Sequence, residues 1–372
     1  MKVALVHDYL NQAGGAERVL AQLHRLFPDA PIYTTILDRN VLWPGLRDAD
    51  IRTSWMQHLP GILRHHRVYL PFYPATIEGF DLREYDLVIS SSSAFAKAAI
   101  RREGACHICY CHAPMRFVWD YDRYVERENL GRVRELILAP VILLLRRWDV
   151  RTARHPDVYV ANSSTVARRI ATYYGRESDI VFPPVDLERF AASAVLDDYY
   201  LVVSRLVAYK RVDLAVAAFN QLGRPLLIIG DGPDRGALMR LARPNVRFMG
   251  RLPDAEVARY YAHCQAVVFP GEEDFGITAL EANASGRPVI AYGLGGAFDT
   301  VIDGETGILF REQTVASLCS AVARCDAVSW NSALLREHAE RFNEAAFAAG
   351  ITAAIERAMR MARPRMGLAG AA

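Results

Sequence analysis

Short apolar segments rich in β-branched residues alternate along the whole chain with segments of helical periodicity. In the N-terminal half the apolar segments lie at 3–8, 32–36, 87–91, 107–112, 158–163 and 180–184. In the C-terminal half they lie at 200–205, 225–230, 246–250, 266–271, 288–293 and 307–310. Strands that alternate with helices in this way form parallel sheets covered by helices on both faces. The pattern therefore predicts an α/β protein with two Rossmann-like, doubly wound domains.

A pair of prolines separates the two sets of strands. Pro183 and Pro184 exclude a helix there and stiffen the connection. We therefore expect an N-terminal domain over 1–186 and a C-terminal domain over 187–342. Residues 343–372 predict one or two amphipathic helices that cross back to the N-terminal domain, followed by a short tail at 367–372 without ordered structure.

Composition and charge narrow the possible classes of protein. The chain has 372 residues, of which 52% are hydrophobic and 23% charged, as in globular proteins of about two domains. A net charge of +2 is far below the strongly basic balance that nucleic-acid-binding proteins carry. The longest apolar run, 136–145, is half of the roughly 20 residues that a membrane-spanning helix needs. Because the N-terminus turns polar at His7 and Asp8, we expect no signal peptide and a cytoplasmic protein.

The cysteines are too few and too clustered for a disulfide framework. Cys106, Cys109, Cys111 and His112 lie close together in sequence and raise the possibility of a metal site. They fall in an apolar segment that predicts a buried strand, however, and neighbouring side chains of a strand point to opposite faces. We expect reduced thiols and no bound metal.

Two carboxylates flank the segment that is most informative about function. Glu273 follows the predicted strand 266–271, and Glu281 lies about one turn into the helix that comes next. The backbone N–H groups of Phe275, Gly276 and Ile277 would form the start of that helix, which favours a diphosphate. Since phosphate repels carboxylates, Glu273 and Glu281 would instead accept hydrogen bonds from sugar hydroxyls. The segment thus predicts a sugar-nucleotide site, with solvated helix carboxylates as the alternative.

Two further groups fit the same kind of ligand. Arg205 and Lys210 follow the predicted strand 200–205, where two cations can neutralise a pyrophosphate. Gly14 and Gly15 follow the first strand and precede a helix, so that the backbone can approach an anionic ligand there. The alternatives are surface charges for the first group and a simple tight turn for the second.

Taken together, these features resemble family 4 of the glycosyltransferases, which are retaining enzymes of the GT-B fold. The resemblance rests on the E-x7-E run 273–281, the Arg205 and Lys210 pair, the Gly14-Gly15 loop, the Pro183-Pro184-Val185-Asp186 linker and the Gly295-Gly296 turn. It extends over nearly the whole chain. It implies two domains facing across a cleft and a nucleotide-sugar substrate, with no further cofactor.

The resemblance also implies roles for individual residues. Glu273 would contact the donor sugar and Glu281 the ribose, while Arg205 and Lys210 would contact the diphosphate. Phe275, Gly276 and Ile277 would hold phosphate and sugar through their backbone.

A histidine and the motif around it refine the resemblance. His112, in CHAPMRFVWD, matches a family histidine near the donor sugar, although a histidine at a strand end is more often structural. The H-x-P-x-R-F-x-W-D form resembles a mannosyltransferase-like branch that builds bacterial polysaccharides, which implies GDP-mannose as donor. Phe298-Asp299 departs from the family pattern, where a glutamate usually follows the double glycine.

An arginine-rich apolar segment bears on the acceptor. Residues 132–154 place apolar residues between arginine pairs and a tryptophan, which is typical either of a helix lying on an anionic membrane or of a buried helix with charged ends. The basic and aromatic run 64–73 is a second candidate for the acceptor side. These segments predict a polyprenyl diphosphate-linked or saccharide acceptor and a peripheral position on the inner face of the plasma membrane.

Other functions are compatible with a nucleotide-sugar binding site. A UDP-sugar-dependent transferase, a sugar-nucleotide epimerase on a similar scaffold and a non-catalytic sensor would all bind the diphosphate. Only a transferase that uses lipid-linked acceptors has a clear need for the segment 132–154.

Overall fold

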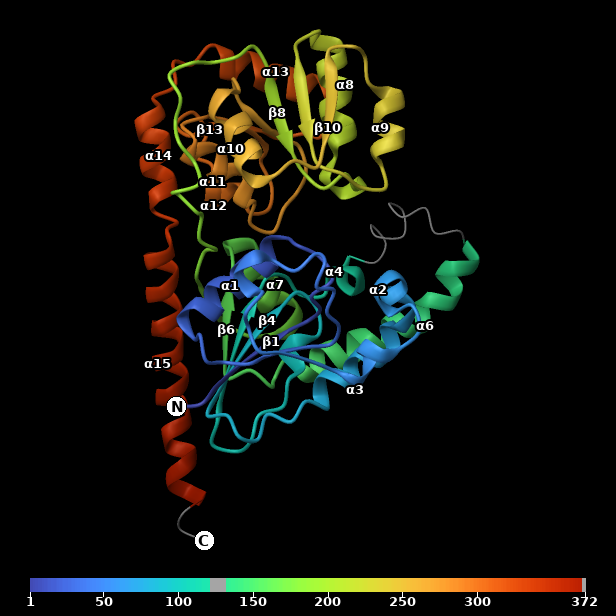
Figure 1. Ribbon diagram of the computed structural model, residues 1–372, viewed down its shortest axis with the longest axis vertical. Helices are drawn as coiled ribbons and strands as arrows, with labels where there is room; N and C mark the ends of the chain where they lie inside the picture. The colour runs from blue at the N-terminus through green and yellow to red at the C-terminus, as the bar shows by residue number, and fades with distance from the viewer. Residues whose placement is uncertain (121–131, 370–372) are drawn as a thin grey trace. The chain divides into compact units, whose positions relative to one another are not determined.

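The computed structural model describes the backbone of residues 1–120 and 132–369 and the side chains of residues 1–120 and 139–361. The chain divides into two compact units (Figure 1). Unit 1 comprises Met1–Phe182 and Phe347–Ala372, and unit 2 comprises Pro183–Ala346. The boundary between the units falls directly before the paired prolines. No helix within the described part of the chain is both long and apolar enough to span a membrane.

Unit 1 is built on a parallel sheet in the order β3-β2-β1-β4-β5-β6-β7. Its strands are β1 (Val3–His7), β2 (Ile32–Thr34), β3 (Ile51–Thr53), β4 (Leu87–Ser92), β5 (Cys106–Cys111), β6 (Val158–Ala161) and β7 (Ser178–Ile180). The strand order reverses between β1 and β4, which places the topological switch point of this sheet there. In the register of these two strands, His7 lies opposite Ser91.

Helices cover both faces of this sheet. They are α1 (Gly15–Leu26), α2 (Ile62–His65), α3 (Tyr73–Glu78), α4 (Arg116–Trp119), α6 (Arg132–Thr152), α7 (Ser164–Tyr174) and α15 (Glu344–Ala369), with 3-10 turns η1 (Pro44–Leu46), η2 (Trp55–His58), η3 (His66–Phe72) and η4 (Ala96–Ala98). α1 and α15 pack on one face through Leu20, Leu23, Phe347 and Ile351, while α3 and α6 pack on the other. Figure 1 shows α15 running along unit 1.

Unit 2 repeats the same design with the strand order β10-β9-β8-β11-β12-β13. Its strands are β8 (Tyr200–Val203), β9 (Leu226–Ile229), β10 (Val246–Gly250), β11 (Val267–Phe269), β12 (Val289–Tyr292) and β13 (Gly307–Phe310). Its helices are η5 (Ala208–Lys210), α8 (Val212–Leu222), α9 (Arg235–Leu241), α10 (Asp254–His263), α11 (Ile277–Ala284), α12 (Ala297–Thr300), α13 (Val315–Asp326) and α14 (Ser332–Glu340). All the pairings are parallel, and the switch point lies between β8 and β11.

The sequence misplaced a few of these elements. The strand expected at 180–184 lies at Ser178–Ile180, because Pro183 and Pro184 lack the N–H groups that a strand donates. The edge strand β3 was not predicted, since its three residues are half-exposed or exposed and carry little apolar signal. The tail expected to be unstructured is helical as far as Ala369, and 370–372 lie outside the described residues.

All six cysteines are free thiols. Cys106, Cys109 and Cys111 lie on β5, where alternation sends them to opposite faces of the sheet, with Cys106 in one apolar core and Cys109 and Cys111 in another. No group of three or more histidine, cysteine or acidic side chains in the described residues is arranged to hold a metal ion.

A buried carboxylate organises the end of the first strand. Asp8 is 2% exposed, and its two oxygens accept hydrogen bonds from four successive backbone N–H groups, those of Ser93, Ala94, Phe95 and Ala96, at 2.6–3.0 Å. This contact joins the end of β1 to the loop after β4. A carboxylate suits this position because buried N–H groups left without an acceptor are costly.

We expect Asp8→Ala to lower the free energy of unfolding of the protein by about 3 kcal/mol, since four backbone donors, three of them in buried residues, lose a charged acceptor. Urea unfolding followed by circular dichroism measures the change. The exposed Asp48, substituted in the same way, serves as the control and should stay within about 0.5 kcal/mol of the native protein. Equal stability of the two variants would contradict the role assigned to Asp8.

Candidate functional site

The candidate site in unit 2 lies at the carboxyl ends of β8 and β11. The chain after β8 forms η5, which ends at Lys210, and the chain after β11 forms the loop that carries Glu273. The Lys210 ammonium and the Glu273 carboxylate form an ion pair, and their side chains are 20% and 14% exposed. Two residues 63 positions apart in sequence are thus brought together at the switch point.

Arg205, the other predicted cation, is placed differently from Lys210. It is exposed, and its side chain makes no hydrogen bond or ion pair with the described residues. The backbone around it is nonetheless held, because Leu206 N donates to Asp231 O at 3.0 Å. Arg205 is therefore an exposed cation, whereas Lys210 is held in an ion pair.

Glycines let the loops of this site pack backbone to backbone. A Cβ atom on Gly271 would come within 2.9 Å of the backbone of Tyr209 and Lys210. Side chains on Gly230 and Gly232 would collide with the backbone of Ser204 and Leu206. The loops after β8, β9 and β11 therefore support one another.

The double glycine after β12 completes this packing. Gly296 N donates to Glu273 O at 2.8 Å, and Gly295 is paired with Glu273 in an isolated β-bridge. A Cβ atom on Gly296 would collide with the backbone of Phe275 and Asp274. The Gly295-Gly296 turn therefore fixes the backbone from Glu273 to Phe275.

The start of α11 adds a region of positive potential beside the ion pair. Gly276 precedes the helix with φ +89°, a conformation that favours glycine, and no side chain caps the first turn. The N–H groups at the start of the helix, including that of Ile277, carry the positive end of its dipole. These groups suit an anionic ligand.

Glu281 lies deeper in the same unit. It is 5% exposed, and one of its carboxylate oxygens accepts a hydrogen bond from the Tyr261 hydroxyl on α10 at 3.0 Å. This contact orients the carboxylate within the helix packing. Glu273 and Glu281 thus differ in burial, with Glu273 the more accessible of the two.

In unit 1 the structure links His112 to the Gly14-Gly15 loop. Glu17 on α1 accepts a hydrogen bond from Gly14 N at 2.8 Å and faces His7 at 3.7 Å. His7 Nδ1 lies 3.1 Å from Ser91 Oγ, which lies 2.8 Å from His112 Nε2. Two groups that the sequence predicted separately therefore belong to one buried cluster.

The backbone at the two glycines does not itself require glycine. Gly14 is extended, with φ −139°, and a Cβ atom on Gly15 would meet nothing within 4 Å. The interpretation as a tight turn therefore has no support from the backbone conformation. The open surface at Gly15 is compatible with close approach of a ligand.

Burial and charge set the protonation of this cluster. Burial lowers the pKa of His112 to about 3, so the imidazole is neutral near pH 7. Burial would raise the pKa of Glu17, but the interaction with His7 and the charge of that ring outweigh it and hold the pKa below its ordinary value. His112 is therefore a neutral hydrogen-bonding group beside an ionised Glu17.

Comparisons with known proteins identify the family. The profile described as "Glycosyltransferase Family 4" matches residues 13–189, and that of "Glycosyl transferases group 1" matches residues 197–326. The D-inositol 3-phosphate glycosyltransferase of Segniliparus rotundus is 30% identical over 371 residues, which cover 84% of this chain and 79% of that protein. The chain belongs to glycosyltransferase family 4.

Other relatives match over shorter stretches. A GDP-mannose-dependent alpha-(1-6)-phosphatidylinositol monomannoside mannosyltransferase of Mycobacterium tuberculosis is 32% identical over 199 residues, 45% of this chain and 52% of that protein. The glycogen synthase of Mycobacterium tuberculosis is 36% identical over 133 residues, 33% of this chain. The match spans about a third of that glycogen synthase, at 32% of its length.

A solved structure confirms the predicted fold of this family member. The crystal structure of HepE from Anabaena in complex with UDP superposes with a TM-score of 0.70 at 18% identity, covering 96% of this chain and 100% of that one. At this identity the likeness concerns the fold, which is GT-B with two parallel-sheet Rossmann-like domains.

Sequence reasoning missed three members of the cluster around His112 in this glycosyltransferase-family chain. His7, Glu17 and Ser91 were not singled out, although His7 and Ser91 are polar residues at the carboxyl ends of apolar strands. That position was a usable signal, because the carboxyl ends of adjacent parallel strands meet at one edge. The signal for Glu17 was weaker, since an acidic residue in the first turn of a helix is common.

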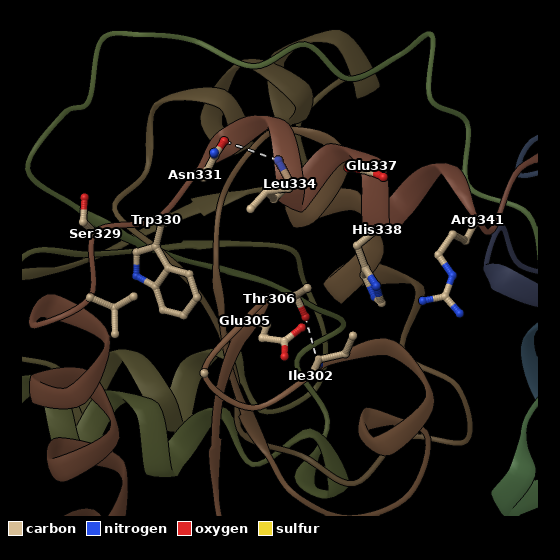
Figure 2. A pocket seen from close by; sticks show the side chains of 12 residues that line it. Ile302, Glu305, Thr306, Ser329, Trp330, Asn331, Leu334, Glu337, His338 and Arg341 are labelled. Carbon is tan, nitrogen blue, oxygen red and sulfur yellow. Dashed lines mark hydrogen bonds between the residues drawn. The ribbon is translucent and has the colours of Figure 1, made fainter.

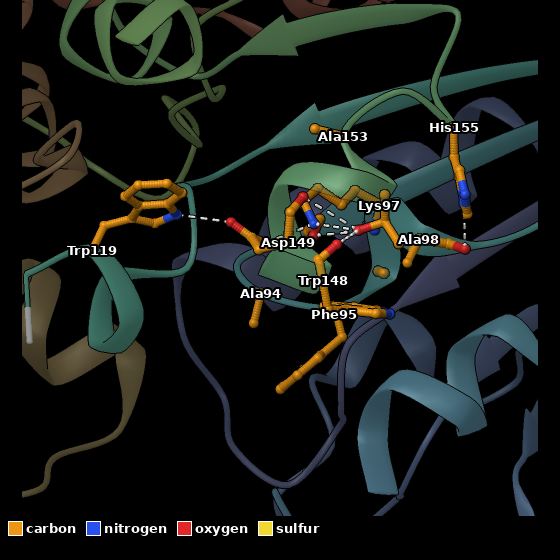
Figure 3. A network of polar contacts seen from close by, with 12 residues as sticks. Ala94, Phe95, Lys97, Ala98, Trp119, Trp148, Asp149, Ala153 and His155 are labelled. Carbon is orange, nitrogen blue, oxygen red and sulfur yellow. Dashed lines mark hydrogen bonds and ion pairs between the residues drawn. The ribbon is translucent and has the colours of Figure 1, made fainter. Parts of the chain in front are cut away.

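A second buried network holds the segment that follows His112 (Figure 3). Lys97, one of the few lysines of the chain, forms an ion pair with Asp149 of α6 at 2.7 Å, and both side chains are at most 2% exposed. The other oxygen of Asp149 accepts a hydrogen bond from Trp119 Nε1 at 2.8 Å. The pair therefore anchors α4, which carries the tryptophan of the H-x-P-x-R-F-x-W-D motif.

A cavity of about 490 Å³ in unit 2 lies elsewhere (Figure 2). It is lined by Ile302, Thr306, Trp330, Asn331 and His338, among others, and by none of the residues that the sequence analysis assigned to the site. It therefore contributes nothing to the grouping of Lys210, Glu273 and α11.

We expect Gly296→Ala to lower the melting temperature of the protein by several degrees, because its Cβ would displace the backbone of Phe275. Differential scanning fluorimetry measures the shift. Gly236→Ala, in helix α9 with its nearest neighbour 3.7 Å from the added carbon, is the matched control and should be neutral or slightly stabilising. A melting temperature of the Gly296 variant equal to that of the control would refute the close-packing role.

Proposed function

We propose that this chain is a retaining glycosyltransferase that moves a hexose from a nucleotide sugar to a lipid-linked or saccharide acceptor of a cell-surface polysaccharide. The observation that carries the proposal is the Lys210–Glu273 pair at the switch point of unit 2, beside the uncapped start of α11. A cation and helix N–H groups suit a diphosphate, while a carboxylate suits sugar hydroxyls. Membership of glycosyltransferase family 4 supports the same reaction class.

In the proposed mechanism the leaving nucleoside diphosphate gains negative charge as the glycosidic bond breaks. Lys210 and the N–H groups of Gly276 and Ile277 meet that charge with donors that are already in place, and Arg205 adds a further cation, which lowers the barrier. Glu273 holds the sugar through its hydroxyls, and Glu281 holds the ribose. We propose that the leaving group departs and the acceptor attacks on the same face of the sugar, so that the anomeric configuration is retained.

GDP-mannose is the donor that we propose. A relative whose name states GDP-mannose dependence matches 45% of this chain. UDP-sugars are the second candidate, because the structurally similar HepE was solved in complex with UDP. An epimerase would convert the sugar nucleotide without an acceptor, and a sensor would bind it unchanged.

We expect Glu273→Gln to lower kcat/KM for sugar transfer at least 100-fold, about 2.7 kcal/mol, since the donor sugar loses a charged acceptor. The assay measures release of nucleoside diphosphate from GDP-mannose and UDP-glucose, with and without polyprenyl diphosphate-linked sugar. Binding of GDP or UDP, followed by thermal shift, should persist, because a ligand at about 100 times its Kd stabilises by about 2.7 kcal/mol.

Glu256→Gln is the control for this substitution. Glu256 lies in the first turn of α10, is exposed and should give native transfer rates. Near-native transfer by the Glu273 variant would overturn the role of that carboxylate. Nucleotide release that does not depend on any acceptor, together with an epimerised donor, would favour the epimerase.

Part of the segment 132–154 is buried like a core helix, and part of it is exposed, as a membrane-contacting helix would be. Helix α6 buries Ile142, Leu145 and Trp148 in unit 1, as a core helix does. Leu143 and Leu144 are 50% and 64% exposed. The side chains of 132–138 lie outside the described residues.

The arginines in and next to α6 likewise include one that contacts the fold and others that are exposed. Arg146 donates to Val118 O at 2.7 Å and lies over the Trp119 ring, so it stabilises the fold. Arg147 is exposed, as is Arg154, which lies two residues beyond the end of α6. We propose that the exposed side of α6, with Leu143, Leu144 and Arg147, together with Arg154 just after the helix, contacts an anionic membrane that carries the acceptor.

The variant Arg147→Glu/Arg154→Glu should bind phosphatidylglycerol-containing vesicles about 30-fold more weakly than the native chain, since each arginine near such a surface contributes about 1 kcal/mol. Vesicle sedimentation measures the binding. Arg240→Glu/Arg247→Glu, the same charge change at exposed positions of unit 2, is the control. Equal vesicle-bound fractions of the two variants would contradict the membrane proposal.

A further inference from the structure

Four side chains in consecutive contact connect the first helix of unit 1 to His112, and we call this set the relay. Glu17 lies on α1, His7 ends β1, Ser91 lies near the end of β4, and His112 directly follows β5. Glu17 Oε1 lies 3.7 Å from His7 Nε2, His7 Nδ1 lies 3.1 Å from Ser91 Oγ, and Ser91 Oγ lies 2.8 Å from His112 Nε2. Because β1, β4 and β5 are adjacent and parallel, their carboxyl ends form one continuous line.

All four residues of this relay are buried. Glu17, His7 and Ser91 are 1%, 2% and 0% exposed. Glu17 is held by hydrogen bonds from Gly14 N at 2.8 Å and from Gln12 Nε2 at 3.1 Å. The backbone of His112 donates to Ser92 O at 2.8 Å and accepts from Asn162 Nδ2 at 3.0 Å. These contacts hold Glu17 and the backbone of His112 in place at the two ends of the set.

Counting protons gives the direction of each hydrogen bond. Glu17 Oε1, at 3.7 Å from His7 Nε2, is too far for a direct hydrogen bond, but its negative charge favours a proton over a lone pair on that nitrogen. While His7 holds a single proton, its Nδ1 is a lone pair and accepts the hydroxyl proton of Ser91. The hydroxyl has no second proton, so Ser91 Oγ accepts from His112, whose proton is therefore on Nε2. His112 Nδ1 is left as a lone pair.

The unprotonated Nδ1 of His112 is the end of the relay that a ligand can reach. His112 Nδ1 makes no hydrogen bond with the described residues and is not sealed from solvent. A lone pair accepts a hydrogen bond from a hydroxyl and repels a carbonyl or phosphate oxygen. Sugars present hydroxyl groups, whereas a diphosphate presents only acceptors at neutral pH.

We propose that Glu17, His7 and Ser91 are positioning residues that fix His112 in the tautomer with its proton on Nε2, so that Nδ1 accepts a hydrogen bond from a hydroxyl group of a sugar substrate. The sugar as ligand rests on the proposed function, while the tautomer does not. The relay gives a neutral imidazole one definite polarity, which in solution it lacks. Through the relay, Glu17 acts on the tautomer of His112 without touching the ligand.

The same strand supplies a matched control. Ser90 precedes Ser91, points to the other face of the sheet and lies 2.8 Å from His107 Nε2 through its Oγ. Ser90 and His107 are both 0% exposed, and burial lowers the pKa of His107 to about 3. Ser90→Ala thus removes an equivalent serine–histidine hydrogen bond from the same strand without touching the relay.

The test uses the full chain with 15N-labelled histidine at about pH 8, where a histidine of ordinary pKa carries one proton. The 15N shifts distinguish a protonated ring nitrogen from a bare one, and His112→Asn identifies the signals. We expect the proton on Nε2 in the native chain. In Ser91→Ala it should move to Nδ1, because a buried N–H without an acceptor costs about 1–3 kcal/mol.

Glu17→Gln provides a second variant that removes no hydroxyl. Its amide can present either oxygen or N–H to His7, so the polarity is no longer imposed and both tautomers of His112 should appear. Ser90→Ala should leave the His112 signals unchanged. A native chain with the proton on Nδ1, or native signals in both Ser91→Ala and Glu17→Gln, would overturn the relay.

Kinetics connect the tautomer to the reaction. Ser91→Ala should lower kcat for transfer about 10-fold and leave the Kd for GDP or UDP within about twofold, since the residues proposed to bind the nucleotide lie on unit 2. Ser90→Ala should keep native kcat. Native kcat in Ser91→Ala with a changed His112 tautomer would overturn the contact with the sugar. Absence of transfer by the native chain from every sugar nucleotide would overturn the proposed function alone, because the NMR result is obtained without substrate.

Discussion

Parallel strands bury their middles and expose their polar residues only where they end, and this constraint governs both units of the protein. In each sheet the strand order reverses beside the first strand, so that the connections leave in opposite directions and the carboxyl edge stays open there. In unit 2 this position holds Lys210 and Glu273. In unit 1 it holds His7 and Ser91, with His112 on the next strand end. Polar and charged side chains gather at these edges because the rest of each sheet is covered by helices.

The loops at these edges are rigid because their backbones touch. Gly271, Gly295 and Gly296 allow contacts that any side chain would block, and the backbone of Glu273 is held by a hydrogen bond from Gly296. Donors and charges fixed before a ligand arrives need no reorganisation during the reaction, which is the main source of electrostatic catalysis. The glycines therefore fix the backbone of the candidate site, and the proposed function depends on that placement.

Buried charges carry out the corresponding task in unit 1. Asp8 gathers the N–H groups of the loop after β4, and the Lys97–Asp149 pair holds Trp119 and hence α4. The ionised Glu17 faces His7 within the same unit. An unpaired buried charge is costly, so each of these groups has partners, and each pairing also fixes a segment next to His112. The polar interior of this unit thus serves to orient one end of the sheet.

Much of the fold and part of the site could be predicted from the sequence. Apolar periodicity located nearly all the strands, because it depends on local chemistry. Glu273, Lys210 and Gly276 were recognisable because their spacing from strand ends is local too. By contrast, β3 carried too few apolar residues to be seen, and Arg146 was not recognisable as a structural residue from its neighbours in sequence.

By itself, the sequence determined which segments become strands and helices, since hydrophobic periodicity is set by neighbours a few residues apart. Tertiary structure alone decided that Lys210 pairs with Glu273 and that His112 is linked through Ser91 and His7 to Glu17. Those contacts join residues far apart in the chain, and their geometry follows from strand order and register. A buried polar side chain takes its partner, its pKa and its tautomer from what the fold places within hydrogen-bonding distance, and no local pattern encodes that.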